Sequence, residues 1–327
     1  MFTLHAFHPT RGHWTEASLE ALAGLRADPE VTLWLDLESP TEQESRVLAE
    51  VFHFHPLAIE DCAHEDQRPK LEEYKDHIFL VTQGFACAGT RVEALELQEL
   101  HTFLGDGWMV TVHLGSIAAL EKTWRRLSGE PKLLERGVDF AYYLVADGIV
   151  DDNFPILDHI ADELEELEDA VLSSPKRADL QRIFHLKHHL VSMRRVLSPQ
   201  RDVLGMLAKR GDSRVSERTA LYLRDVYDHL VRINESIESN RDLLGNALDA
   251  YLSAVGQRTN EIMKALTLMS AVFLPLAFVV GFFGQNFQDM PGFHDWTTHD
   301  GLMWVMIGAC IAIPITMLVW FRMKRWL

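Results

Sequence analysis

Hydrophobic residues gather in two uninterrupted runs near the C-terminal end of the chain. Residues 265–283 form nineteen consecutive positions without a charged side chain, and residues 301–321 form twenty-one. As helices these runs would be about 28 and 31 Å long, which suits the ~30 Å hydrocarbon core of a bilayer. The pattern therefore predicts two transmembrane helices; two buried helices of a soluble protein are the less favoured interpretation.

Basic residues flank these runs unevenly. Arg258 and Lys264 precede the first run and a basic tail, 322–327, follows the second, whereas the connector 284–300 contains no Lys or Arg. Because cytoplasmic loops carry an excess of Lys and Arg, both termini are expected in the cytoplasm and the connector outside it. The expected location is the inner (cytoplasmic) membrane of the cell, with lipid as a partner.

Shorter patterns fill residues 1–136. Runs rich in β-formers occupy 31–37 and 77–82, and 101–113 has the pattern of a hairpin with a glycine-bearing turn. Between the first two runs, 41–52 has helical spacing. This part of the chain is predicted to be a cytoplasmic α/β domain.

From residue 137 the apolar spacing becomes helical. A heptad-like series runs through Leu157, Ile160, Leu164, Leu167 and Val171. Turn-forming residues interrupt it at 173–175 and again at 211–213, and from 215 to 283 the chain has a single proline, Pro275. The expected architecture is an α+β membrane protein in which a cytoplasmic long-helix stalk, 137–264, continues directly into the first span.

Charge and composition argue against several classes of function. The chain has 48 acidic and 31 basic residues, a formal charge of −17, which argues against nucleic acid as a partner. Its three cysteines, Cys62, Cys87 and Cys310, have neither metal-ligand nor disulfide-framework spacing. There is no glycine-rich phosphate loop and no nucleophile–base arrangement, so neither an enzyme nor a cofactor is expected.

One face of the first span carries small and polar side chains. At 100° per residue the following positions fall within an arc of about 80°: Asn260, Met263, Thr267, Ser270, Leu274 and Gly281. Two helices cannot enclose a lumen, so transport would require several copies of the chain. This face would then line a pore, or it would serve close helix packing; spacing alone leaves both open.

Several motifs follow one another in a fixed order. RDVYDH stands at 224–229, TNEIMK at 259–264 and FGQNF at 283–287, with HPLAIED at 55–61 in the N-terminal part. These motifs resemble those of the CorA-type divalent metal ion transporters. The resemblance implies a homopentamer with an ion path along the first span and a peripheral second span.

The resemblance also implies a selectivity ring at the outer end of the first span. Gly284, Gln285 and Asn286 occupy the place of the family's Gly-Met-Asn motif. Neutral amide oxygens suit a hydrated Mg²⁺, which sheds its water reluctantly. Because Gln285 replaces the methionine, Mg²⁺ is favoured but transport of Zn²⁺, Co²⁺ or Ni²⁺, with or without proton coupling, stays open. A non-conducting membrane scaffold or sensor is the second alternative.

Regulation by cytoplasmic metal is a further implication of the resemblance. Asp225 matches the family's stalk aspartate and Asp162 a second carboxylate near that site, so divalent cations are expected both as substrate and as regulatory ligand. The partner position on the neighbouring subunit falls near 87–88, where this chain has no carboxylate.

A histidine cluster and an acidic cluster are interpreted as ordinary surface features. His185, His188 and His189 have spacing that suits Zn²⁺, but the basic residues around them disfavour a cation. The acidic run around Asp61 is interpreted as an ordinary polar helix end.

Overall fold

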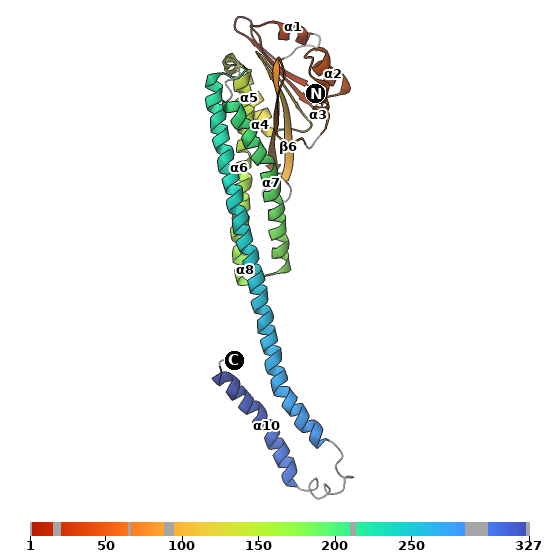
Figure 1. Ribbon diagram of the computed structural model, residues 1–327, viewed down its shortest axis with the longest axis vertical. Coiled ribbons are helices and arrows are strands. Elements are labelled where there is room, and N and C mark those ends of the chain that lie inside the picture. The colour runs from red at the N-terminus through yellow and green to blue at the C-terminus, as the bar shows by residue number, and fades with distance from the viewer. Residues whose placement is uncertain are drawn as a thin grey trace. The chain divides into compact units, whose positions relative to one another are not determined.

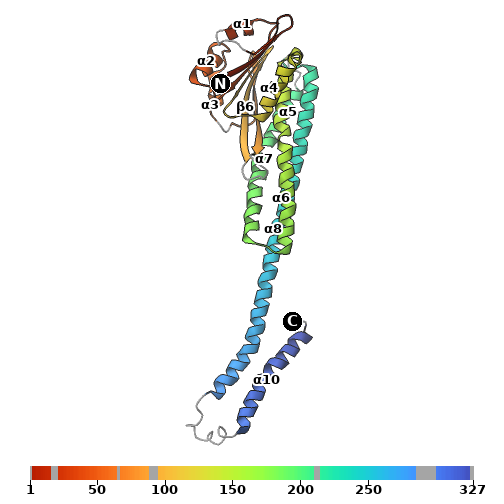
Figure 2. The ribbon, with the colours of Figure 1, turned by 180° about the vertical axis from the view of Figure 1, so that it is seen from behind.

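The computed structural model describes residues 2–15, 21–64, 67–87, 95–209, 214–284 and 300–324. Figures 1 and 2 show its ribbon from opposite sides. The chain divides into two compact units, Met1–Ala250 and Tyr251–Leu327. Helix α8 (Glu217–Phe283) contributes to both.

The first unit is built on a mixed sheet, with seven strands in the described part of the chain. Their order is β2-β1-β3-β7-β6-β5-β4, and every neighbouring pair is antiparallel except β3 and β7. The strands are β1 (Phe2–His8), β2 (Gly12–Trp14), β3 (Thr32–Glu38), β4 (Lys70–Glu73), β5 (His77–Cys87), β6 (Leu95–Gly105) and β7 (Trp108–His113).

The strands predicted at 31–37, 77–82 and 101–113 are confirmed as β3, β5 and the β6–β7 hairpin. Gly107, with φ +77°, forms the turn of that hairpin in the left-handed region that glycine tolerates. Strands β1, β2 and β4 were not predicted. β1 has the sequence FTLHAFH and is covered on both faces, so that even its polar side chains His5 and His8 are buried.

Three short helices accompany one face of the sheet and contribute to its main apolar core. They are α1 (Leu22–Ala27), α2 (Glu42–Glu50) and α3 (Pro56–Ala63). Their buried side chains share a core with the sheet residues Leu33, Phe79 and Phe103. The predicted helix at 41–52 is confirmed as α2, whose start is fixed by a capping box between Thr41 and Glu44.

The remaining helices of the first unit are α4 (Ala118–Gly129), the 3₁₀ turn η2 (Pro131–Arg136), α5 (Val138–Asp151), α6 (Asn153–Ser173), α7 (Arg177–Lys209) and the first part of α8. Buried polar contacts join this layer to β5. The hydroxyls of Thr82 and Tyr142 lie 2.9 Å apart. The backbone N–H of Gln83 donates to Oε1 of Gln200 at 2.9 Å. Gly84 allows the closest approach, because a Cβ there would lie 2.5 Å from Cγ2 of Ile149.

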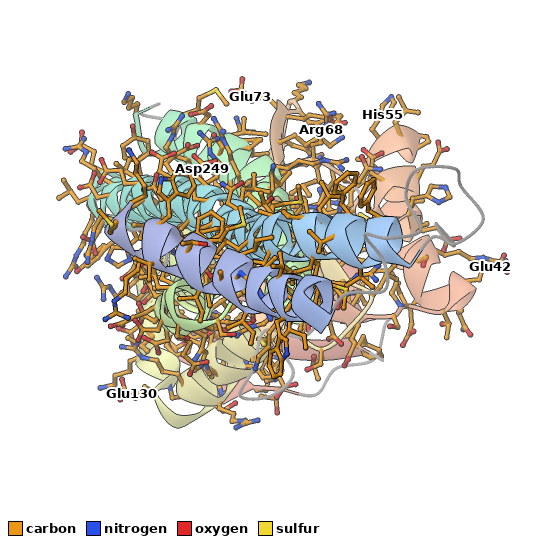
Figure 3. The ribbon with its side chains drawn as sticks, turned by 90° about the horizontal axis from the view of Figure 1, so that it is seen from below. Glu42, His55, Arg68, Glu73, Glu130 and Asp249 are labelled. Atoms are coloured by element: carbon orange, nitrogen blue, oxygen red, sulfur yellow. The ribbon has the colours of Figure 1, made fainter. Side chains whose placement is uncertain are left out.

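The heptad-like series predicted within residues 157–171 is confirmed. All five of its apolar side chains are buried on α6. Charged side chains lie on the surface of the unit, and Figure 3 shows Glu42 of α2 and Glu130, at the end of α4, projecting outward.

The second unit consists of the end of α8 and helix α10 (Asp300–Met323) in the described residues. Both helices are long and apolar enough to cross a membrane, with mean hydropathies of 2.2 and 2.1 over their most apolar windows. Almost none of the most apolar stretch of either helix is buried within the chain. Leu274, for example, is 75% exposed and Phe278 is 71% exposed. Apolar surface of this extent requires lipid or other protein chains to cover it. The single long helix predicted from 215 to 283 is confirmed as α8, which has 67 residues.

Candidate functional site

Three side chains of types that can ligate a metal meet in the first unit. Asp147 and Asp151 stand four residues apart on α5 and so share one face of that helix. His229 reaches them from α8: its Nδ1 lies 3.0 Å from Oδ1 of Asp151 and 4.0 Å from Oδ1 of Asp147. One ligand atom from each residue lies within 4.8 Å of the other two, and we refer to Asp147, Asp151 and His229 as the cation cluster.

The electrostatics of the cation cluster favour a bound cation. Burial, and then the charge of Asp151, raises the pKa of Asp147 above its usual value. Asp225 adds a third carboxylate, since its Oδ2 lies 3.9 Å from Nε2 of His229. Burial and the charges of Asp147 and Asp225 also raise the pKa of Tyr143 to about 12. Three carboxylates thus crowd one imidazole, and a divalent cation would relieve their repulsion.

The donor set fits more than one divalent metal. Carboxylate oxygens are the ligands that Mg²⁺ takes from proteins, and Mg²⁺ keeps several of its waters. An imidazole nitrogen suits Zn²⁺, Co²⁺ or Ni²⁺ better. Asp151 and Asp225 are 49% and 66% exposed, so water reaches the cation cluster and can complete a coordination shell.

Only one of the two predicted regulatory residues lies at this place. Asp225 borders the cation cluster, whereas Asp162 is exposed on α6. Asp162 follows Asp151 by eleven residues, about 16 Å at 1.5 Å per residue, so one chain does not bring Asp162 and Asp225 together. Sequence reasoning missed Asp147, Asp151 and His229. The spacing of four between Asp147 and Asp151, and between Asp225 and His229, is the signal that could have found them.

The histidine cluster of α7 and the acidic run around Asp61 lie outside the cation cluster. His185 and His189 stack edge to face with ring centroids 4.3 Å apart, but in the described part of the chain the three histidines do not form a group with converging ligand atoms. Asp61 makes a 2.6 Å ion pair with Lys70, as expected of a polar helix end. Cys87 is the last residue of β5, and position 88 lies outside the described residues.

The predicted pore-lining residues occupy one exposed face of α8. Within the chain every one of them is exposed: Asn260, Met263, Thr267, Ser270, Leu274 and Gly281. The least exposed positions of this part of α8 are Leu268, Ala271, Val272, Pro275, Leu276 and Val279. The two sets are centred about 130° apart around the helix axis. In both ribbon views α10 runs back along the end of α8 (Figures 1 and 2), and the polar face of α8 remains free of packing within the chain.

Thr267 presents a hydroxyl oxygen on this face. Its hydroxyl donates to the Met263 carbonyl, four residues earlier, at 2.7 Å. With the hydrogen directed into the helix, the lone pairs of the oxygen are left for other donors or for a cation.

The predicted selectivity ring begins where α8 ends. Gly284 is described and donates its amide to the Val280 carbonyl at 2.8 Å. Gln285 and Asn286 lie outside the described residues.

Comparison with known proteins identifies the family. The family model for CorA-like Mg²⁺ transporter proteins matches residues 29–325. This chain belongs to the CorA family. It is 35% identical over 293 residues to YfjQ of Bacillus subtilis, covering 90% of this chain and 89% of that protein. It is 32% identical over 303 residues to the cobalt/magnesium transport protein CorA of Thermotoga maritima, covering 92% and 85%.

The fold is shared with a solved CorA structure. The CorA magnesium transporter from Methanocaldococcus jannaschii superposes with a TM-score of 0.83 over 99% of this chain and 98% of that one, at 22% identity. These findings confirm the resemblance to CorA-type transporters stated from the motifs. A family of transporters also agrees with the expectation of a transporter rather than an enzyme.

Proposed function

We propose that the chain is one subunit of a homopentameric, channel-like transporter that passes divalent cations, Mg²⁺ foremost, down their electrochemical gradient. The observation that carries the proposal is the course of α8. One uninterrupted helix bears Asp225 and His229 of the cation-binding region and, farther along, the exposed polar face from Asn260 to Gly281.

The exposed face of α8 and membership of the CorA family both support an assembly of several copies, which we propose is a homopentamer. The described residues of a single chain offer two candidate spans, and two helices alone cannot enclose a lumen. Copies of α8 arranged around an axis would place the polar face inward and leave the other faces for α10 and lipid. Thr267 and Ser270 would then form hydroxyl rings, and Leu274 an apolar constriction.

The proposed outer selectivity ring is Gly284, Gln285 and Asn286. Amide oxygens of Asn286 would accept hydrogen bonds from the water shell of Mg²⁺, without the tight trap that carboxylates would make. The glutamine in place of the family's methionine makes this mouth more polar.

The membrane arrangement is part of the proposal. Residues 1–136 and 137–264 would form the cytoplasmic α/β domain and stalk, 265–283 and 301–321 the two spans, 284–300 the outer loop and 322–327 the cytoplasmic tail. The distribution of Lys and Arg supports this orientation in the inner membrane. An inside-negative potential would favour entry of a divalent ion by roughly 4.6 kcal/mol per 100 mV.

Gating would depend on the cation cluster. A cytoplasmic cation held by Asp147, Asp151 and His229, with Asp225 beside it, would bind α5 to α8 within one subunit. Asp225 and Asp162 remain proposed contributors to sites shared with a neighbouring subunit.

The decisive experiment is cation flux into proteoliposomes. Mg²⁺, Zn²⁺, Co²⁺ and Ni²⁺ are each supplied with and without a pH gradient. The expected result is Mg²⁺ entry that needs no pH gradient and that Asn286→Ala abolishes while the oligomer persists in detergent. Flux of the other metals alone would establish the alternative cargo, and the absence of flux for every ion would establish the non-conducting scaffold or sensor.

A further inference from the structure

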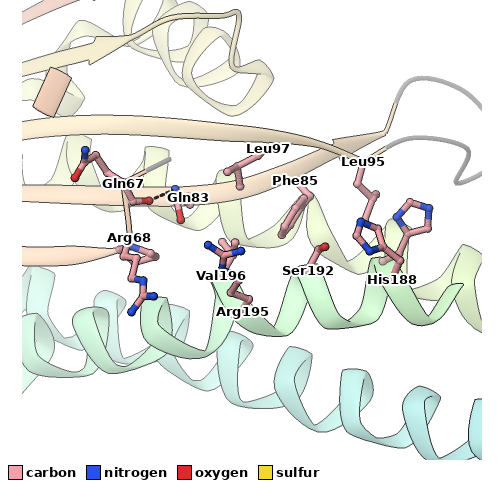
Figure 4. A pocket seen from close by; sticks show the side chains of 12 residues that line it. Gln67, Arg68, Gln83, Phe85, Leu95, Leu97, His188, Ser192, Arg195 and Val196 are labelled. Carbon is pink, nitrogen blue, oxygen red and sulfur yellow. Dashed lines mark hydrogen bonds between the residues drawn. The ribbon is translucent and has the colours of Figure 1, made fainter. Parts of the chain in front are cut away.

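A cavity of about 440 Å³ opens between α7 and the paired strands β5 and β6 of the first unit. Its walls come from residues 67–69, from the two strands and from one face of α7 (Figure 4). The volume falls in the range of small-molecule sites, ~300–1,000 Å³. The cavity shares no residue with the cation cluster.

The cavity is basic in an acidic protein. Its described lining includes Arg68, Arg195 and His188 but no acidic residue. The whole chain, by contrast, has 48 acidic and 31 basic residues. A lining of this kind selects for anions and disfavours the cations that the rest of the protein attracts.

The two arginines have no acidic partner in the part of the chain that the structure describes. Among the described residues, neither Arg68 nor Arg195 makes a side-chain hydrogen bond or ion pair. Other arginines of α7 do: Arg182 pairs with Glu163, Arg194 with Glu238 and Arg201 with Asp202. Two unpaired guanidinium groups at one cavity offer the planar, bidentate donors that phosphate groups accept.

An apolar wall stands opposite α7. Phe85, Leu95 and Leu97 line the strand side of the cavity, and Figure 4 shows them across from Arg195 and Ser192. Leu97 belongs to β6 and is 40% exposed, so part of this wall is open to solvent. A flat apolar body in the cavity would cover it.

Polar groups continue along the cavity. His188, Ser192 and Arg195 are spaced by four and then three residues, so they lie on one face of α7. The distance from His188 to Arg195 along the helix is about 10 Å. A ligand that uses both ends must be extended and must carry polar groups at more than one point.

We infer that this cavity binds a nucleoside phosphate. The phosphate would lie between Arg68 and Arg195, the base would pack on Phe85 and Leu97, and Ser192 and His188 would face the polar edge of the ligand. Inorganic phosphate satisfies the arginines alone and leaves the apolar wall uncovered. The inference stands apart from the proposed transport function, because it concerns anion binding to the first unit.

The test is calorimetric titration of the full chain in detergent, with chelator present so that metal binding plays no part. The probes are AMP, ADP and inorganic phosphate. ADP is expected to bind, with inorganic phosphate at least tenfold weaker. Arg68→Gln and Arg195→Gln should each weaken ADP binding about tenfold. Leu97→Ala should weaken ADP binding and leave inorganic phosphate unaffected.

Arg194→Gln is the matched control, because Arg194 is the neighbouring arginine of α7 and pairs with Glu238 instead of lining the cavity. It should bind ADP like the unaltered protein. Each variant is also heated with and without ADP, so that a folding defect appears as a lowered Tm in the absence of nucleotide. No ADP binding at millimolar concentration, or full binding by a normally folded Arg68→Gln/Arg195→Gln double variant, would overturn the site. Inorganic phosphate binding as tightly as ADP would overturn the nucleoside assignment.

Discussion

His229 and Asp151, 78 residues apart in the chain, meet with Nδ1 3.0 Å from Oδ1. The contact joins the long helix α8 to α5 at the one place where carboxylates and an imidazole converge in the described residues. A cation bound there would strengthen a connection that the fold already makes.

Asp147→Asn should raise the Tm of the metal-free protein and reduce its stabilisation by Mg²⁺. Burial and the charge of Asp151 raise the pKa of Asp147, so above that pKa the ionised carboxylate destabilises the folded state. Removing the charge should add about 1 kcal/mol, or roughly 2–4 °C in Tm. Thermal unfolding in detergent, with and without Mg²⁺, measures both effects.

Asp169→Asn provides the control, because it removes one charge from an exposed position on α6 outside the cation cluster. It should leave the Mg²⁺-dependent rise in Tm intact. An equal Mg²⁺ response in Asp147→Asn and the unaltered protein would contradict a cation at the cluster.

Asp36→Asn should destabilise the protein more at pH 6 than at pH 9. Burial opposes ionisation of His113, but the hydrogen bond and charge of Asp36 outweigh it and raise the pKa of His113 above 6.5. A raised histidine pKa contributes stability that is complete below the unfolded value and is lost as the pH rises through the folded value. The loss should be about 3 kcal/mol at the lower pH.

The measurement for Asp36→Asn is the Tm difference from the unaltered protein at several pH values. That difference should shrink steadily above pH 6.5 as His113 becomes neutral in both proteins. A difference independent of pH would mean that the contact between Asp36 and His113 is not an ion pair.

Thr267→Val should lower Mg²⁺ flux about tenfold without changing the oligomer, because it removes one oxygen ring from the proposed path. Thr316→Val is the matched control: Thr316 also donates its hydroxyl to a helix carbonyl, but on α10. Proteoliposome flux should separate the two variants. Equal losses from both would indicate a general effect on the membrane helices and remove Thr267 from the path.

Gly84→Ala should destabilise the first unit by about 1–3 kcal/mol through overpacking. The added Cβ would lie 2.5 Å from Ile149 Cγ2 and 3.0 Å from the Ile149 carbonyl, so α5 would have to move away from β5. Gly245→Ala on α8 meets nothing within 4 Å and should instead stabilise the helix by roughly 0.5–1 kcal/mol. The two Tm shifts should therefore have opposite signs.

The long elements could be predicted because their signals are local. The heptad-like apolar series of α6, the break before Arg177 and the uncharged run that ends α8 each lie within one stretch of sequence. Strand β5 was predicted only as far as Thr82, because both of its faces are covered and no alternation marks the residues up to Cys87.

The cation cluster could not be predicted in full, for a different reason. Asp147 and Asp151 come from α5 and His229 from α8, and their meeting depends on how two distant helices pack. The motif around Asp225 lies on the same stretch of α8 as His229, whereas Asp162, the other carboxylate implied by the resemblance, stands eleven residues beyond Asp151.

Helix α8 runs without a loop from Glu217 to Phe283. The segment that holds His229 and the segment that bears Thr267 are therefore turns of the same rod, tied by consecutive backbone hydrogen bonds. No flexible linker separates the two segments. A displacement of one segment would therefore reach the other through twisting, bending or translation of the helix. Under the proposed gating, the response to metal at the cation cluster would depend on the stiffness of the intervening turns, among them the exposed glycines Gly245 and Gly256.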